Sequence, residues 1–562
     1  MKQFIFTISA LSLVFSSCNT LKNNSKDDKD SSKAFKTIDQ SYLDKGVRPQ
    51  EDFFMYANGS WIKKNPVPPS ESRWGSFNEL EQNNKIKLTE ILKECVANPG
   101  NPGSDAHILG QYYTSYIDMD TRNQLGIAPI KAEIAAIRQI NSKDELLPLI
   151  AQQHMYGIGS FFSFGVGQDL KNVEKNITYI GQGGISLPNK DYYSAENKKE
   201  IREKFMEYMK SIFVLAGYGA DEATKMSYMV MKFETQMAET MMAPADLRAP
   251  EKTYNKFSME ACAQLIAPLE FKVYLSEIKS QSFDSIVVSQ PEHLRNLGKL
   301  IEKSDITVLR TYMLWKTLNH YAGCLDQRFV DTRFSFYGKV LSGKSEMKAI
   351  TERAIDEITN KEFGEILGKE FVKRHFSEAA QKRVSIMVDN LLIVFQERIK
   401  SLDWMTSETK NEALNKLNSI GRKLGFPSKW EDFSVLIFDK AKYVENVKAE
   451  NLYAHLKNMK ELYLPVDKEK WGMPAHMVNA YYHPLLNEIA FPAGIMQAPF
   501  FDENAEDAVN YGRIGMVIGH EFTHGFDDMG SKFAADGSFK NWWSEADLAA
   551  FQEKTGILGE TF

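Results

Sequence analysis

Residues 515–528 read GMVIGHEFTHGFDD, and within them His520, Glu521 and His524 form the pattern H-E-x-x-H. On a helix, side chains four residues apart lie on one face, so the two imidazole rings can bind a single Zn²⁺ ion. Glu521 falls beside the open position of the metal. There it can take a proton from the zinc-bound water during attack on a carbonyl and later pass it to the leaving amine. The pattern therefore predicts a zinc-dependent hydrolase of peptide bonds.

The pattern is specific in this chain, and its surroundings favour a helix. Histidine occurs only 10 times in 562 residues, so about 0.01 chance matches are expected. Glu503, Asn504, Glu506 and Asp507 supply acidic and capping residues for a helix start, and Gly530 is the expected end. The two histidines and the glutamate are therefore expected on one continuous helix between these points.

A third protein ligand, often a glutamate, normally completes such a zinc site. Glu545 lies 21 residues after His524 and is one candidate. The same glutamate also fits a helix start, with Ser544 as the N-cap and Glu545 and Asp547 in an acidic first turn. Both interpretations of Glu545 stay open at this point.

Helical periodicity dominates residues 37–471. Apolar residues recur at i, i+3 and i+4 in several segments, namely 85–96, 144–153, 198–215, 221–240, 346–360 and 377–402. Residues 410–423 form a further, basic amphipathic pattern, which predicts a helix with a solvated lysine face. Glycine- and proline-rich breakers separate these segments, and they predict a large, mainly helical domain.

The pattern changes after about residue 471. Residues 477–482 predict a strand, residues 483–487 a turn, and residues 488–491 a returning strand. A second domain is therefore expected over residues 472–562, and the fold class is mainly α with a small β component.

Composition excludes several other classes of protein. The net charge is −6, without the basic excess typical of a nucleic-acid binder. An aromatic content of 12% argues against disorder across the chain. No segment after the N-terminus is long and apolar enough to span a membrane. The expected partners are peptides, and the sequence does not predict the oligomeric state.

The N-terminus predicts export. Residues 1–18 combine a basic start, a short apolar run and a small-residue exit, as in a secretory signal peptide. Cys18 follows Ser16 and Ser17 as in a bacterial lipobox, which predicts lipidation and a membrane anchor on the periplasmic or cell-surface side; plain secretion is the alternative. Residues 19–36 are polar and predict a flexible tether. The remaining Cys95, Cys262 and Cys324 are expected to be free thiols.

Several separated blocks together resemble the neprilysin-like M13 family of zinc metallopeptidases, in the bacterial oligopeptidase O branch. The blocks are DFFMYANGSW at 52–61, LPNKDYY at 187–193, WMT at 404–406, GFP at 425–427, VNAYY at 478–482, the segment containing the two histidines, and WW at 542–543. The resemblance implies a large helical lobe and a thermolysin-like (gluzincin) catalytic lobe around a chamber that admits short peptides.

The resemblance also implies roles for individual residues. His520 and His524 would bind one zinc ion, and Glu521 would be the general base. Asn479 and Ala480 match the strand that holds the substrate main chain, a form of strand addition; an ordinary strand edge is the alternative. Asp527 could orient His524, or could be a solvated charge at the helix end.

The chain departs from the family at its C-terminal end. The family's third ligand is a glutamate in G-E-N-x-x-D roughly sixty residues past the second histidine, whereas 38 residues follow His524 here. The catalytic lobe is therefore expected to be incomplete, and the 562-residue chain to be inactive as written. The alternatives are a non-catalytic peptide-binding or structural lipoprotein, and a peptidase that uses Glu545 as its third ligand.

Overall fold

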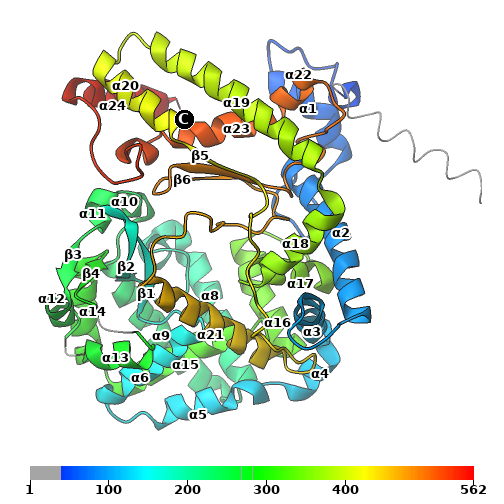
Figure 1. The fold of residues 1–562 in the computed structure, drawn as a ribbon. Coiled ribbons are helices and arrows are strands. Elements are labelled where there is room, and N and C mark those ends of the chain that lie inside the picture. The colour runs from blue at the N-terminus through cyan, green and yellow to red at the C-terminus, as the bar shows by residue number, and fades with distance from the viewer. Residues whose placement is uncertain (1–38, 268, 281–282, 562) are drawn as a thin grey trace, which may run out of the picture.

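The computed structural model describes residues 39–267, 269–280 and 283–561. The expected signal peptide, Cys18 and the tether at 19–36 lie outside these residues. Figure 1 shows two lobes, one above the other, with helix α2 (Ser76–Ala97) running along one side of both. None of the helices in the described residues is both long and apolar enough to cross a bilayer.

The larger lobe is built almost entirely from helices around one hydrophobic core. Trp315, Tyr112 and Tyr312 are among the largest side chains fully buried in it. Its helices are α3 (Asp105–Ile117), α4 (Met119–Leu125), α5 (Lys131–Gln139), α6 (Leu146–Met155), α7 (Asp191–Ser194), α8 (Lys199–Leu215), α9 (Ala220–Glu239), α10 (Pro244–Leu247), α11 (Pro250–Thr253), α12 (Met259–Leu265), α13 (Phe271–Glu277), α14 (Pro291–Lys303), α15 (Ile306–Tyr321), α16 (Gln327–Arg333), α17 (Ile350–Thr359), α18 (Gly364–His375) and α21 (Tyr443–Glu461), with a π-helical stretch at Phe334–Leu341.

The larger lobe also contains a four-stranded sheet that the sequence patterns did not predict. The strands are β1 (Phe162–Asp169), β2 (Asn172–Gln182), β3 (Lys256–Ser258) and β4 (Ser285–Val288), in the order β1-β2-β4-β3. β1 and β2 form an antiparallel hairpin, β2 and β4 are parallel, and β3 is antiparallel to β4. The strand from 285 is thus added to a hairpin formed more than a hundred residues earlier.

The smaller lobe has its own hydrophobic core, which packs helices against a three-stranded sheet. Its helices are α19 (Glu378–Ser401), α20 (Ser407–Asn418), α22 (Asp507–Gly512), α23 (Ile514–His524) and α24 (Glu545–Glu560), and α1 (Phe53–Lys64) lies beside α22 in Figure 1. Its strands are β5 (Gly421–Gly425), β6 (Tyr481–His483) and β7 (Glu488–Pro492) in the order β5-β7-β6. β5 is parallel to β7, and β6 is antiparallel to it.

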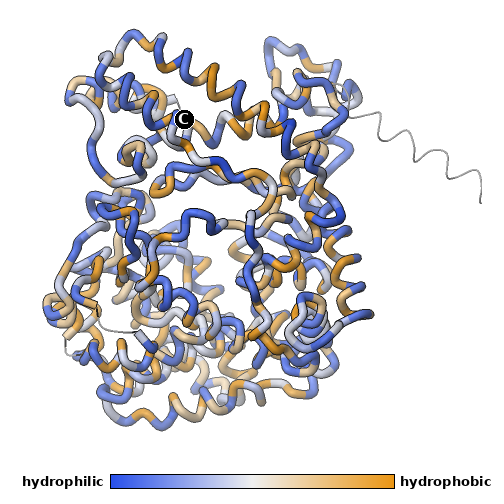
Figure 2. Tube along the Cα trace, in the orientation of Figure 1, coloured by the Kyte–Doolittle hydropathy of each residue, from blue (hydrophilic) through white to orange (hydrophobic). Residues whose placement is uncertain are grey.

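Most of the helices expected from periodicity are present at close to their expected bounds. The expected segment 198–215 is α8, 221–240 is α9 and 377–402 is α19. Figure 2 shows hydrophilic and hydrophobic residues interleaved along the helices, as in helices that pack on one face only. The mainly α fold class with a small β component is confirmed.

The prediction for residues 410–423 was partly wrong. The helix α20 ends at Asn418, and residues 421–425 are strand β5. β5 pairs with β7, which lies more than sixty residues later in the chain, and this pairing overrides the local helical pattern. Two of the lysines expected on a solvated face, Lys416 and Lys423, are buried.

The two hydrophobic cores divide the described chain into two packing units. Helices α19 and α20 and strand β5 precede residue 472, yet they share the second core with α23. The domain limits at 471 and 472 therefore stay a sequence prediction, whereas the packing unit around the histidines extends back to about residue 378. Cys95, Cys262 and Cys324 are free thiols in the part of the chain that the structure describes.

Candidate active site

The histidines lie on α23, whose other face is fixed in the core of the smaller lobe. Ile514, Ile518 and Phe522 recur every four residues and are fully buried, which leaves the opposite face for polar side chains. The expected continuous helix is interrupted at Arg513, whose backbone (φ −110°, ψ −95°) is not helical, so α22 and α23 are separate. α23 ends at His524, earlier than the expected end at Gly530.

His520 and His524 point their imidazole rings at one another. Their Nε2 atoms lie 3.0 Å apart. Two nitrogen ligands at ~2.0–2.1 Å from one tetrahedral zinc ion lie about 3.3 Å apart, close to the observed separation. At this distance an Nε2–H group of one ring can donate a hydrogen bond to the other. When neither Nε2 atom carries a proton, both lone pairs point into the same space, so the pair can bind one metal ion.

Asp527 lies at the second histidine. Its Oδ2 atom accepts a hydrogen bond from Nδ1 of His524 at 2.8 Å. Its Oδ1 atom accepts the backbone N–H groups of Met529 (2.9 Å) and Gly530 (2.7 Å). Because the proton of the imidazole is held on Nδ1, the lone pair of His524 is on Nε2, the atom that faces His520.

Glu521 is buried beside this pair. Its side chain is only 5% exposed, and its Oε2 atom has no hydrogen-bond partner among the described residues. Burial raises the pKa of Glu521 to about 7, although the nearby His524 lowers it. A carboxyl group with a pKa near neutrality can both accept and donate a proton, as a general base and acid must.

Asn479 and Ala480 precede the edge strand β6. Both residues lie just before Tyr481, where β6 begins, so the strand starts later than the expected residue 477. Asn479 is exposed, and no hydrogen bond joins the backbone of either residue to the rest of the described chain. β6 is an edge strand of the sheet, and it packs against α23, the helix that carries the histidines.

Glu545 is at the start of α24 as expected for a helix-capping segment. Ser544 is the N-cap, and its side chain accepts the N–H of Asp547, with Glu545 in the first turn. Within residues 39–561, apart from the short gaps, no group of three His, Cys, Asp or Glu side chains is placed to hold a metal ion. The described residues therefore bring together two histidines but not Glu545 with them.

The sequence patterns did not single out Lys416, which lies behind this site. It occupies the buried face of α20, in line with Thr409, Ala413 and Leu417. A lysine at a position of the apolar stripe is the one sequence signal that could have identified it. Its Nζ atom donates hydrogen bonds to carbonyls of the segment that follows Asp527.

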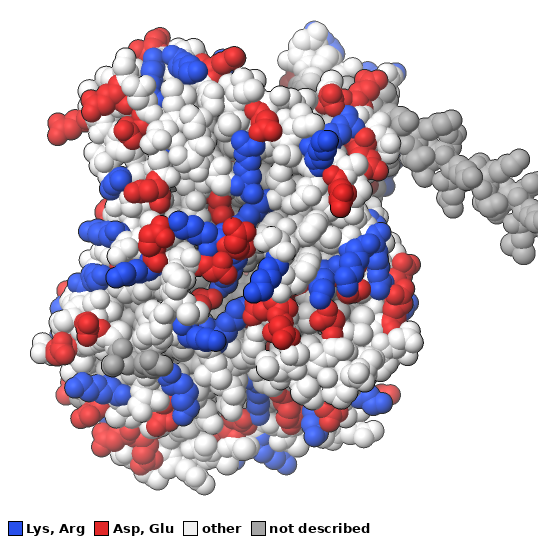
Figure 3. All heavy atoms as spheres, in the orientation of Figure 1, with Lys and Arg blue, Asp and Glu red and all other residues white. Residues whose placement is uncertain are grey.

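The segment after α23 also contacts the larger lobe. Arg248, just after α10, pairs with Asp528 at 3.1 Å, and Lys532 pairs with Glu251 of α11 at 3.1 Å. Figure 1 shows α10 and α11 close to this segment. On the face in Figure 3, acidic and basic side chains are interspersed and gather around the hollow at the waist between the lobes.

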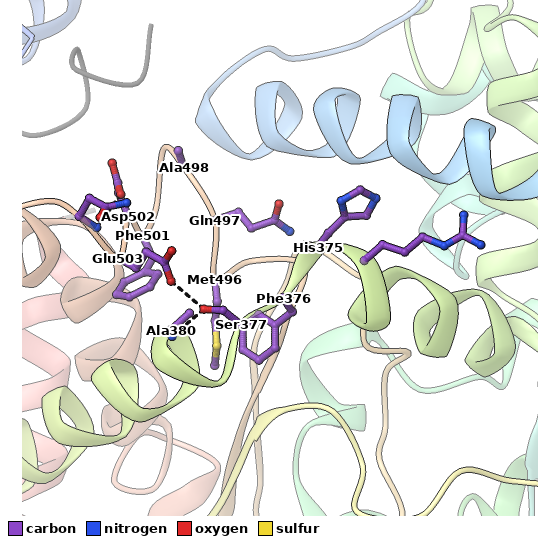
Figure 4. Close-up of a pocket in the computed structure, with 12 residues that line it drawn as sticks. His375, Phe376, Ser377, Ala380, Met496, Gln497, Ala498, Phe501, Asp502 and Glu503 are labelled. Atoms are coloured by element: carbon purple, nitrogen blue, oxygen red, sulfur yellow. Dashed lines mark hydrogen bonds between the residues drawn. The ribbon is translucent and has the colours of Figure 1, made fainter. Parts of the chain in front are cut away.

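A separate hollow of about 620 Å³ lies away from the histidines (Figure 4). It lies between the start of α19 and the 496–504 segment, where Ser377 donates a hydrogen bond to Glu503 at 2.6 Å. None of His520, Glu521 and His524 lines it. The hollow is thus a feature of the junction between the lobes and not part of the candidate active site.

Comparisons with known proteins agree with this arrangement. Two family models, each described as peptidase family M13, match residues 49–427 and 479–562. An endothelin-converting enzyme homolog of Locusta migratoria is 30% identical over 93% of this chain and 75% of its own length. Endothelin-converting enzyme 1 of Mus musculus is 31% identical over 92% of this chain and 70% of its own length.

Solved structures show the same fold. Mycobacterium tuberculosis zinc metalloprotease Zmp1, in complex with an inhibitor, matches with a TM-score of 0.90 at 31% identity, over 93% of this chain and 80% of that one. PepO from Lactobacillus rhamnosis matches with a TM-score of 0.83 at 24% identity, over 90% of this chain and 80% of that one, which supports the fold alone. The motifs, the paired histidines and both family models agree, and the chain belongs to peptidase family M13 of zinc metallopeptidases.

Proposed function

We propose that this chain is a zinc-dependent endopeptidase that hydrolyses short peptides. The observation that carries the proposal is the convergence of the two Nε2 atoms of His520 and His524 beside the unpartnered, buried carboxyl group of Glu521. When bound at this pair, zinc would polarise a peptide carbonyl and make water acidic enough to react near neutral pH. The cofactor is thus one zinc ion per catalytic site.

Glu521 and Asp527 have different roles in the proposed reaction. Glu521 takes a proton from the attacking water and returns it to the leaving amine. Its burial favours this role because a carboxylate in water would be too weak a base to hold the proton. Asp527 keeps the proton of His524 on Nδ1, so that Nε2 stays free to bind the metal.

Asn479 and Ala480 are proposed to bind the main chain of the peptide. A peptide lying along the outer edge of β6 would add a strand to the sheet and pass the histidines on α23. The unpaired backbone groups of both residues support this role, because a strand added to a sheet edge needs unsatisfied donors and acceptors.

The described residues supply two histidine ligands, and zinc peptidases normally have three protein ligands. We therefore expect zinc that is held by these two histidines alone to be bound weakly. Two further functions remain outcomes of the test: a lipoprotein that binds peptides without cleaving them, and a peptidase whose third ligand is Glu545.

Export is part of the proposal. A signal peptide over residues 1–18, with lipidation at Cys18 and a tether over residues 19–36, would place the catalytic chain on the periplasmic or outer side of a membrane. The peptide substrates would then come from that compartment.

The test compares Glu521→Gln with Glu545→Gln, which makes the same chemical change elsewhere. We expect Glu521→Gln to abolish hydrolysis of a quenched fluorescent peptide by the full gene product while zinc affinity stays within about threefold, because the carboxamide cannot take up a proton. Glu545→Gln should change neither quantity. Retained turnover in Glu521→Gln would refute the proposed base, and loss of zinc in Glu545→Gln would identify Glu545 as a ligand.

If the unaltered protein binds peptides and zinc but cleaves no peptide in a library, the binding function is the correct one. If it binds no zinc at any concentration that leaves it folded, the zinc peptidase proposal is refuted.

A further inference from the structure

Lys416 is a buried amine that the proposed chemistry does not use. It is 1% exposed and lies on the inner face of α20. Its Nζ atom faces the rings of Tyr482 (6.0 Å), Phe526 (5.5 Å) and Trp542 (5.8 Å), measured to the ring centroids. Aromatic faces attract a cation, but they do not replace the water that an ammonium group loses on burial.

Within the described chain, Lys416 forms no ion pair at salt-bridge distance. Instead, Nζ donates hydrogen bonds to the backbone carbonyls of Gly530 and Phe533, both at 2.6 Å. Burial lowers the pKa of Lys416 to about 7, with the charge of Asp527 acting in the opposite direction. A methionine of similar length would fill this space without the cost of desolvating an amine, so packing alone does not account for a lysine here.

The two carbonyls belong to the segment that holds Asp527. The backbone N–H of Gly530 donates to Oδ1 of Asp527, and the N–H of Ser531 donates to its backbone carbonyl. Gly530 also packs on the end of α23, since a Cβ added there would lie 1.8 Å from the carbonyl oxygen of His524. The position of Gly530 and the position of Asp527 are thus coupled.

We propose that Lys416 is a positioning residue for the metal site: by holding the carbonyls of Gly530 and Phe533 it fixes Asp527, which in turn orients the imidazole of His524. The inference rests on the proposed zinc site. Helix α20 carries no proposed zinc ligand, but through Lys416 it would keep His524 oriented towards His520.

A matched control is available in the same lobe. Lys423 is also buried (9% exposed), and it also donates to a backbone carbonyl, that of Lys470, at 2.8 Å. Its second partner is Glu488 on the neighbouring strand β7. Among the described residues, no hydrogen bond or ion pair joins Lys423 to residues 525–533, so Lys423→Met removes a buried amine of the lobe and leaves the hydrogen bonds of the Asp527 segment in place.

The test measures two quantities in Lys416→Met, Lys423→Met and the unaltered full chain. Zinc affinity is measured by competition with a chromophoric chelator, and hydrogen exchange of the Met529 and Gly530 amides is measured in the metal-free protein. We expect Lys416→Met to weaken zinc binding about tenfold and to speed exchange of both amides about tenfold or more, because their acceptor Asp527 is no longer held. Lys423→Met should change neither by more than about twofold, whatever its melting temperature.

Several results would overturn the inference. One is that Lys416→Met keeps both the zinc affinity and the Met529 and Gly530 exchange rates of the unaltered protein. Another is that Lys423→Met changes these quantities as much as Lys416→Met does. If Lys416→Met does not fold, Lys416→Gln, which keeps a donor for one carbonyl, is measured in the same way, and native values there overturn the inference. Failure of both variants to fold would do so as well, because Lys416 would then serve the fold as a whole.

The two proposals fail separately. If the unaltered chain binds no zinc, the proposed function is refuted, while hydrogen exchange at Met529 and Gly530 still decides whether Lys416 holds the segment. If zinc binds normally in both the unaltered chain and Lys416→Met, the proposed function stands and the role of Lys416 is refuted.

Discussion

Replacing Asp527 by asparagine tests how the second histidine is oriented. The carboxylate of Asp527 accepts three hydrogen bonds, from Nδ1 of His524 and from the N–H groups of Met529 and Gly530. An asparagine has only one acceptor oxygen. If that oxygen keeps the two backbone N–H groups, its NH₂ group faces Nδ1 of His524, and the proton of the imidazole must move to Nε2.

That change places a proton on the atom that faces His520. If the asparagine flips instead, His524 keeps its tautomer, but the two backbone N–H groups lose their acceptor and the 527–530 segment is released. Either arrangement removes a hydrogen-bond partner of a metal ligand, which typically weakens metal binding 10–100-fold. This corresponds to about 1.4–2.7 kcal/mol of zinc binding free energy.

Asp528→Asn is the matched control. Asp528 is adjacent, its side chain is 67% exposed, and it pairs with Arg248 across the lobes and not with a histidine. Both variants change the net charge of the protein equally, so the change in net charge alone does not produce a difference between them. Zinc affinity is measured by chelator competition at one ionic strength, and circular dichroism checks that both variants are folded.

We expect Asp527→Asn to bind zinc at least tenfold more weakly than Asp528→Asn, which should bind within about twofold of the unaltered protein. Equal affinities in the two variants would refute the conclusion that Asp527 orients His524. The hydrogen bond seen between them would then be a helix-end contact without effect on the metal.

Three further predictions concern the surroundings of the site. Gly530→Ala should lower the melting temperature and weaken zinc binding more than tenfold, since the new Cβ would lie 1.8 Å from the carbonyl oxygen of His524; thermal unfolding and chelator competition measure this. Burial lowers the pKa of Lys416 in the folded protein to about 7, so the unfolded chain binds more protons than the folded one between about pH 7 and pH 10. The free energy of unfolding should therefore rise with pH over that range. Urea unfolding of Lys416→Met should not show this rise. The exposed Arg248–Asp528 ion pair should contribute less than about 1 kcal/mol to the free energy of unfolding, measured by a double-mutant cycle. Arg248→Glu should lose this contribution, and the swapped pair Arg248→Glu/Asp528→Arg should recover it. High salt should remove the difference between these variants.

The residues of the proposed metal site could be predicted because the information is local. His520 and His524 are one helical turn apart, and any helix through them places both rings on one face, whatever its packing partners are. The apolar residues Ile514, Ile518 and Phe522 specify which face is buried. For the same reason the long helices α8, α9 and α19 were expected at nearly their observed bounds.

Features that depend on distant partners could not be predicted in this way. Strand β4 at Ser285–Val288 pairs with β2 across more than a hundred residues, and neither segment alone specifies which partner it pairs with. Strand β5 was read as a continuation of the helix before it, because its partner β7 is over sixty residues away. Short strands owe their existence to such pairing and not to propensity.

The sequence by itself determined the family, the helical character of the chain, and the two histidines and glutamate that carry the proposed chemistry. Only the tertiary structure decided that their Nε2 atoms converge to 3.0 Å, that Asp527 binds the outer nitrogen of His524, and that Lys416 turns inward. The difference is physical: spacing along a helix places side chains on a face, whereas burial and hydrogen bonding depend on segments that approach from elsewhere in the chain.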